Sequence, residues 1–216
     1  MTNVSVTVPD DLILQLRTLI PKRRMTYGQA RIIAQQQALR LRKLLGITLT
    51  RLPLDWVERI PGVSVELLTV HEMEKLTKSP DASGATDVRK DGSYRIYINN
   101  SNSITHCRFT LTHELYHVIT GPYVHDIYTD FGHGDQELHD RRVEHVADHF
   151  AANLLMPSSL VKKAWAYGIQ AMPDLAARFD VSEEAMRIRL CTIGLIDNGL
   201  TKRMFYRKSQ ALWAGV

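Results

Sequence analysis

RFTLTHELYHVI, residues 108–119, is the stretch that decides how the centre of this chain folds. Its histidines His113 and His117 are four positions apart, so on a helix both rings lie on one face and can reach the same metal ion. Glu114, between them, would place a general base beside that ion. Apolar residues spaced at i, i+4, i+7 and i+8 predict the buried side of the helix: Leu111, Leu115, Val118 and Ile119. The Gly-Pro pair at 121–122 predicts its end.

A second helical stretch, EHVADHFA at residues 144–151, carries acidic side chains four positions apart. A catalytic zinc site takes three protein ligands and leaves one position for water, and Glu144 is the natural third ligand after His113 and His117. Asp148, one turn further on, is placed to accept the free ring N–H of a metal-binding histidine. The same ligand set also accepts Mn²⁺ or Fe²⁺. The alternative is an ordinary solvent-exposed helix face, on which acidic side chains four positions apart bind no metal ion.

The predicted chemistry also needs a donor for the oxyanion that forms during hydrolysis of a peptide bond. The residue types that can donate and that flank the metal helix give four candidates, which the sequence does not rank: Tyr94, Tyr123, His125 and His133.

Composition predicts a folded, soluble, cytoplasmic protein. The chain has 216 residues, 44% of them hydrophobic, which is ample for a packed core. Cys107 and Cys191 are far apart, so neither a disulfide framework nor a cysteine metal site is indicated. The amino-terminal region lacks the pattern of a signal peptide, and no apolar run approaches the roughly 18 residues of a membrane span.

The amino-terminal part is predicted to form a strand-helix extension, residues 1–25. Alternating valines at 4, 6 and 8 indicate a strand, and a helix over about 26–45 follows. This order also resembles a ribbon-helix-helix DNA-binding fold, in which Asn3, Ser5 and Thr7 would face the major groove. A strand that caps the catalytic sheet would have the same pattern. Between Leu12 and Leu54 all charged residues are basic, which would suit an acidic partner or nucleic acid: Arg17, Lys22, Arg23, Arg24, Arg31, Arg40, Arg42, Lys43 and Arg51.

The middle and end of the chain predict an α+β fold, with a small antiparallel sheet packed on helices. A strand is expected over 63–70, and Asp91-Gly92 indicates a hairpin turn between strands at 85–89 and 94–99. The second of these strands is the expected edge, where an extended peptide would bind. A long loop at 121–141 would form a wall or lid. Residues 173–194 have the length of a helix-turn-helix and are expected to pack structurally, and a basic aromatic tail, 197–216, follows.

The two motifs together resemble the ImmA/IrrE family of metallo-endopeptidases. The carrying segments are RFTLTHELYH (108–117) and EHVADHFAANLLMP (144–157), and the resemblance spans a domain of about residues 26–196. Tyr116 departs from the family pattern, which often has glycine there, and a ring at this position would narrow the cleft. The resemblance implies an intracellular zinc protease that cleaves a DNA-binding repressor with a helix-turn-helix domain and so derepresses stress-response or mobile-element genes.

Three interpretations follow from the sequence. The first is this zinc endopeptidase, with Glu114 as its base. The second is a DNA-binding regulator with a secondary metal site, suggested by the basic amino-terminal block; direct nucleic-acid binding is not favoured. The third is an inactive scaffold in which a metal only stabilises the fold, and Glu114 argues against it because a scaffold needs no base.

Overall fold

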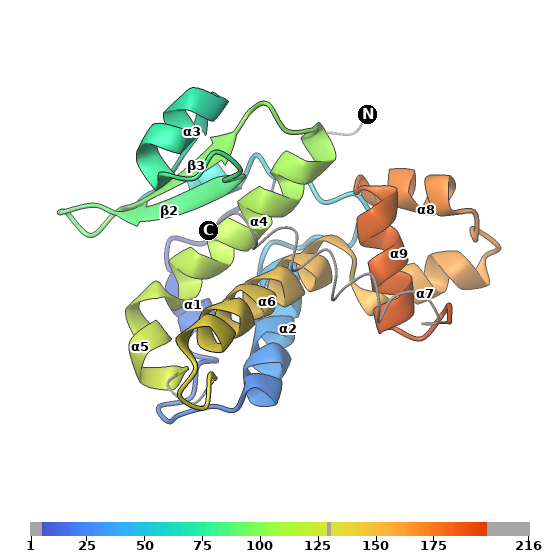
Figure 1. Cartoon of the computed structure of the whole chain (residues 1–216). Coiled ribbons are helices and arrows are strands. Elements are labelled where there is room, and N and C mark those ends of the chain that lie inside the picture. The colour runs from blue at the N-terminus through green and yellow to red at the C-terminus, as the bar shows by residue number, and fades with distance from the viewer. Residues whose placement is uncertain (1–5, 129–130, 198–216) are drawn as a thin grey trace.

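The computed structural model describes residues 6–128 and 131–197 and shows a mainly helical α+β fold (Figure 1). The α-helices are α1 (Leu12–Arg17), α2 (Tyr27–Leu44), α3 (Val70–Thr77), α4 (Ile104–Thr120), α5 (Val124–Ile127), α6 (Gln136–Leu155), α7 (Ser158–Ala166), α8 (Met172–Phe179) and α9 (Glu183–Thr192). The 3-10 turns are η1 (Val57–Arg59) and η2 (Gly121–Tyr123), and the strands are β1 (Val63–Leu68), β2 (Gly84–Val88) and β3 (Tyr94–Asn99). No helix in the described part of the chain is long and apolar enough to cross a membrane.

The sheet is mixed, with strand order β1-β3-β2. Strands β2 and β3 form the predicted antiparallel hairpin, and Gly92 adopts the φ of 81° that its turn requires. Strand β1 pairs parallel with β3, so the prediction of an antiparallel sheet was wrong for this pair. The prediction that Tyr94–Asn99 forms an edge was wrong as well. Helix α3 was not predicted; it separates β1 from β2 in the chain and lets β3 insert between them, which leaves β2 at an edge.

Helix α4 lies at the centre of the fold, with the sheet on one side and α6 on the other (Figure 1). Of its predicted apolar face, Leu115, Val118 and Ile119 are fully buried, and Leu111 is partly buried against the core. The other side of α6 packs on α2, whose alanines at 30, 34 and 38 are all buried. Short side chains at i, i+4 and i+8 let two helices approach closely. The helix that carries Glu144 is therefore held between α2 and α4.

Both ends of α6 are fixed by polar contacts. At its start, the Asp135 side chain accepts a hydrogen bond from a backbone amide of the first turn. At its end, Arg42 donates to the carbonyl oxygen of Leu154 at 2.9 Å and Arg189 to that of Met156 at 2.8 Å. Burial lowers the pKa of each of these arginines to about 10. The guanidinium groups satisfy carbonyls that a helix end leaves free, where a positive charge is favourable.

The amino-terminal segment packs in the same hydrophobic core as the rest. Residues Val6–Val8 form no strand, and residues 1–5 of the expected strand lie outside the described part. The described residues of this segment that enter the core include Val6, Leu12 and Leu16. The helix expected within the strand-helix extension at 1–25 is α1, and the one expected at 26–45 is α2.

The basic block of the amino-terminal half does not form one continuous exposed face. Arg42 is buried, and Arg17 donates to carbonyls at the end of α4. Arg51 forms an ion pair with Asp180 at 3.1 Å. Arg17 and Arg42 are thus engaged within the fold, whereas the Arg51 side chain stays 70% exposed beside its partner.

The segment after α4 is more ordered than the expected loop at 121–141, because η2 and α5 follow at once and α6 begins at residue 136. Tyr128 and Phe131 are buried, and the hydroxyl groups of Tyr116 and Tyr128 lie 2.7 Å apart. The Tyr116 ring is 1% exposed and contacts Phe150 of α6. The prediction that this ring narrows the cleft was therefore wrong; it anchors the following segment to the core.

Two short helices, α8 and α9, lie where a helix-turn-helix was expected, joined by a turn at 180–182. Leu175, Phe179 and Leu190 of this pair are buried in the common core. A role of these helices in binding DNA stays untested. Of the expected tail at 197–216, all but residue 197 lies outside the described residues.

Candidate metal centre

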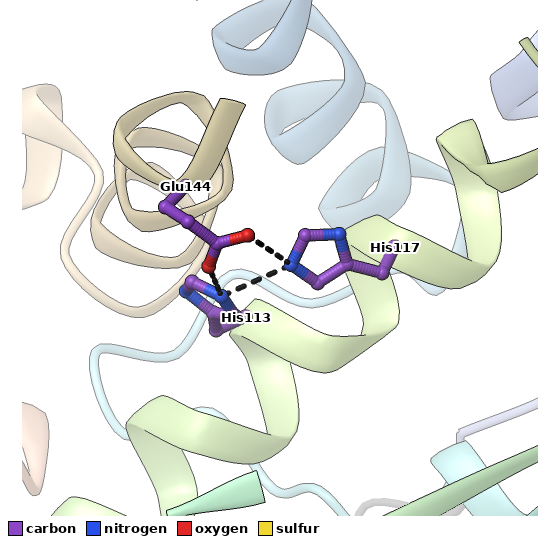
Figure 2. Close-up of side chains that lie close together, drawn as sticks. All are labelled: His113, His117 and Glu144. Atoms are coloured by element: carbon purple, nitrogen blue, oxygen red, sulfur yellow. Dashed lines mark hydrogen bonds and ion pairs between the residues drawn. The ribbon is translucent and has the colours of Figure 1, made fainter. Parts of the chain in front are cut away.

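His113, His117 and Glu144 converge from two neighbouring helices. Figure 2 shows both rings of α4 pointing toward the carboxylate of α6. One donor atom from each residue lies within 4.8 Å of the others, and in the described part of the chain this is the one group of histidine, cysteine and acidic residues with such spacing. His145 and His149, which are close in sequence to Glu144, are not part of it.

The distances between the donor atoms fit a metal ion with tetrahedral coordination. The Nε2 atoms of the two histidines are 3.1 Å apart, and Glu144 lies 3.0 Å from His113 Nε2 and 3.6 Å from His117 Nε2. Ligands at about 2.1 Å from a zinc ion, at tetrahedral angles, are about 3.4 Å from one another. The three groups thus surround a space of the right size for a small divalent metal ion.

Asp148 fixes the orientation of the first histidine. Its carboxylate accepts a hydrogen bond from His113 Nδ1 at 2.8 Å, which leaves Nε2 directed at Glu144 and His117. The structure thereby places Asp148 where the sequence predicted it, on the far side of the ring from the metal position.

The electrostatics of the site favour positive charge among these side chains. Burial opposes protonation of His113, but hydrogen bonds to Asp148 and Glu144 outweigh it and raise the pKa of this ring to about 10. For the Glu144 carboxyl, burial alone would raise the pKa. The hydrogen bonds from His113 and His117 nevertheless hold this pKa far below its usual range. A cation bound between the rings and the carboxylate would satisfy the same demand.

Glu114 points toward β2. It is 7% exposed, and the hydroxyl of Thr86 donates to its Oε2 at 2.7 Å. Strand β2 can come this close because residue 84 is glycine: a β-carbon there would lie 2.5 Å from Thr110 Cγ2 and 3.0 Å from Glu114 Oε1. Thr86 therefore binds the Glu114 carboxylate, the predicted base, by a hydrogen bond, and Gly84 leaves the space that this contact needs.

A pocket of about 360 Å³ joins these groups. It lies between β2 and the metal-site helices and is lined by Gly84, Thr86, Val88, Tyr94, Glu114, His117, Gly121 and Glu144. Its volume is in the range of ligand-binding pockets. Strand β2 lies at the edge of the sheet among the described residues, so its outer backbone is available to an extended peptide next to Glu114.

The four candidate donors for an oxyanion are placed differently. Tyr94 lines the pocket, whereas Tyr123 lies just past the end of α4 and is not among the lining residues. His133 is exposed in a turn with a φ of 49°. The His125 side chain is outside the described part of the chain. Tyr94 is therefore the candidate with a demonstrated place beside Glu114 and His117.

Sequence reasoning missed Gly84, Thr86 and Arg17. Gly84 and Thr86 lie next to Glu114 from 30 and 28 positions away, and Arg17 donates to the Tyr94 hydroxyl across 77 positions. A glycine that precedes a polar residue in a strand is a weak hint of close backbone approach. Nothing in the sequence pattern pointed to Arg17.

Comparisons with known proteins bear on the family and the fold of this chain. A family model described as the IrrE N-terminal-like domain, a peptidase domain, matches residues 63–191, more than half of the chain. A solved structure described as a Mycobacterium tuberculosis transcriptional regulator shares the fold, with a TM-score of 0.55 at 15% identity. The match covers 83% of this chain and 51% of the regulator, so this chain spans about half the length of that protein. No curated protein matches the chain.

Proposed function

Since the chain belongs to the family of peptidases with an IrrE N-terminal-like domain, we propose that it is a metal-dependent endopeptidase. Its protein substrate would bind and be cleaved in the pocket between β2 and α4. The observation that carries this proposal is the convergence of His113, His117 and Glu144 next to a pocket that His117 and Glu144 line together with the buried side chain of Glu114. A purely structural metal site would not need that carboxylate.

His113, His117 and Glu144 would hold the ion, and zinc suits two imidazoles and a carboxylate; Mn²⁺ and Fe²⁺ are alternatives. When bound, the ion would polarise the scissile carbonyl and acidify the attacking water. Glu114 takes the proton of that water and then delivers it to the leaving amine. The Thr86 hydroxyl donates to Glu114 Oε2 and so orients the carboxylate. Asp148 keeps the His113 ring in position.

The substrate is proposed to bind as an extended segment along β2. The outer edge of this strand offers backbone donors and acceptors, and Val88 and Tyr94 supply apolar lining at the pocket. The resemblance to ImmA/IrrE endopeptidases supports a DNA-binding repressor as the substrate. The fold shared with a transcriptional regulator adds no information on the substrate, because the identity is only 15%.

The proposal is tested with the wild-type chain and Glu114→Gln, each loaded with zinc and incubated with a lysate of the cells from which the gene comes. New protein amino termini are identified by mass spectrometry. We expect one or a few cut proteins with the wild type, none with Glu114→Gln or after chelation, and equal zinc content in both proteins. Cuts that persist in Glu114→Gln, or a zinc-loaded wild type that cuts nothing, would contradict the proposal.

A DNA-binding regulator gains less support from the described residues. Arg17, Arg42 and Arg51 of the basic block are engaged in contacts within the fold. The first turn of α9 carries Glu183 and Glu184, and acidic residues at this position repel phosphates. A mobility shift of duplex DNA that weakens steeply with salt would favour this alternative.

A further inference from the structure

Tyr94 is connected to the amino-terminal helix through Arg17. The guanidinium of Arg17 donates to the Tyr94 hydroxyl at 2.8 Å and lies 5.7 Å from the centroid of its ring. It also donates to the carbonyl oxygens of Val118 at 2.9 Å and Ile119 at 3.1 Å, at the end of α4. Arg17 is thus anchored to the metal-site helix and to a pocket residue at once.

The chemistry of arginine determines the direction of the Tyr94 hydrogen bond. A guanidinium has only donors, so the phenol oxygen must accept from Arg17. The phenol keeps its own proton, which is then free to be donated to a second group. Tyr94 lines the same pocket as Glu114 and His117. A substrate bound in this pocket would bring a carbonyl oxygen that needs a hydrogen-bond donor.

We propose that Tyr94 is the donor to the oxyanion that develops on the scissile carbonyl, and that Arg17 is a positioning residue that holds the phenol in place for this task. The positive charge of Arg17 next to the phenol oxygen strengthens the donation, since a donor polarised by a neighbouring cation forms a stronger hydrogen bond. This inference rests on the proposed peptidase function and adds to it two residues of the reaction.

Arg17 lies outside the part of the chain that the family match covers. The family match begins at residue 63, so α1 and α2 lie outside it. If Arg17 positions Tyr94, the amino-terminal helix is part of the active site, and its removal impairs hydrolysis even when the matched domain stays folded.

The first experiment compares Tyr94→Phe with the matched control Tyr97→Phe. Tyr97 is on the same strand and half-buried, but it points to the other face of the sheet and does not line the pocket. Hydrolysis is measured with the fastest-cleaved member of a quenched fluorescent peptide library. We expect Tyr94→Phe to lower kcat by about 10²- to 10³-fold with little change in KM, as for loss of one oxyanion donor. Tyr97→Phe should stay within about twofold of the wild type. Equal kcat for Tyr94→Phe and wild type overturns the assignment.

The second experiment asks whether Arg17 acts through Tyr94. Arg17→Met keeps the apolar stem and removes the donors, and we expect it to lower kcat about tenfold in the wild-type background. In the Tyr94→Phe background the same change should have no further effect, because the phenol oxygen that it positions is absent. An equal loss in both backgrounds would show that Arg17 acts only by stabilising the end of α4, and the positioning role would be refuted. Urea unfolding of each variant measures that structural contribution separately.

A binding measurement separates this inference from the peptidase function. Acetohydroxamate, a small ligand whose oxygens occupy the position of the oxyanion on zinc, is titrated into zinc-loaded wild type, Tyr94→Phe and Tyr97→Phe. We expect about tenfold weaker binding to Tyr94→Phe alone. If the wild type cuts no peptide or protein but this selective loss occurs, the peptidase proposal fails, while Tyr94 is still shown to donate to an oxygen ligand bound at this site. Equal affinities in all three proteins, or no hydroxamate binding at all, overturn the donor assignment.

Discussion

Replacing Gly84 by alanine tests whether β2 holds the Glu114 carboxylate, the proposed base, through close packing. The added β-carbon would lie 2.5 Å from Thr110 Cγ2, while carbon atoms in contact are normally about 3.5–4.0 Å apart. Thr110 is 6% exposed and β-branched, so its side chain has little freedom to move aside. The strand itself must shift, and such overpacking costs about 1–3 kcal/mol. The shift would also lengthen the hydrogen bond from Thr86 to Glu114, so hydrolysis should fall together with stability.

The assay is urea unfolding of the zinc-free protein, followed by hydrolysis with zinc. Gly28→Ala is the matched control, since a β-carbon at this exposed position in the first turn of α2 would have nothing within 4 Å. Alanine there should stabilise the helix by about 0.5–1 kcal/mol. The two substitutions are chemically identical and are expected to move the unfolding midpoint in opposite directions. A Gly84→Ala protein with wild-type midpoint and wild-type hydrolysis would refute the close-packing argument.

Three further predictions concern single side chains around the site. Thr86→Val removes the donor to Glu114 with little change in side-chain shape, so it should lower the rate of hydrolysis about tenfold at unchanged zinc content. Thr86→Ser keeps the hydroxyl and should retain most of the activity. A valine variant as active as wild type would contradict the role of the hydroxyl. Asp148→Asn should weaken zinc binding about 10- to 100-fold in competition with a chromophoric chelator, because the ring of His113 loses its carboxylate acceptor, and unchanged affinity would show that this contact is dispensable. Burial and two nearby arginines lower the pKa of His149 from 6.5 to about 4 in the folded protein. Between these pH values the ring is protonated in the unfolded chain but not in the folded one, so stability is lost as the pH falls from about 6.5 toward 4. Urea midpoints at pH 7 and pH 4.5 should therefore differ less in His149→Gln than in wild type, and an identical difference would mean that this ring does not contribute.

The local elements around the metal centre were predictable because their geometry depends on neighbours in sequence. A helix sets the spacing of His113 and His117 through its own hydrogen bonds, and its apolar period identifies the face that is buried. The hairpin around Gly92 followed from the turn residues, and Asp148 followed from its position one turn after Glu144. The amino-acid sequence therefore determined the general α+β character of the chain and gave the candidates for the metal ligands and the base.

Only the tertiary structure decided which strand borders the cleft and what holds Glu114 and Tyr94. Strand order depends on which pairing buries the most apolar surface over the whole chain, and the parallel pairing of β1 with β3 moved β3 to the centre and β2 to the edge. The contacts of Thr86 with Glu114 and of Arg17 with Tyr94 span 28 and 77 residues. Such contacts form because separate helices and strands pack on one core, and no local periodicity in the sequence encodes which side chains then meet.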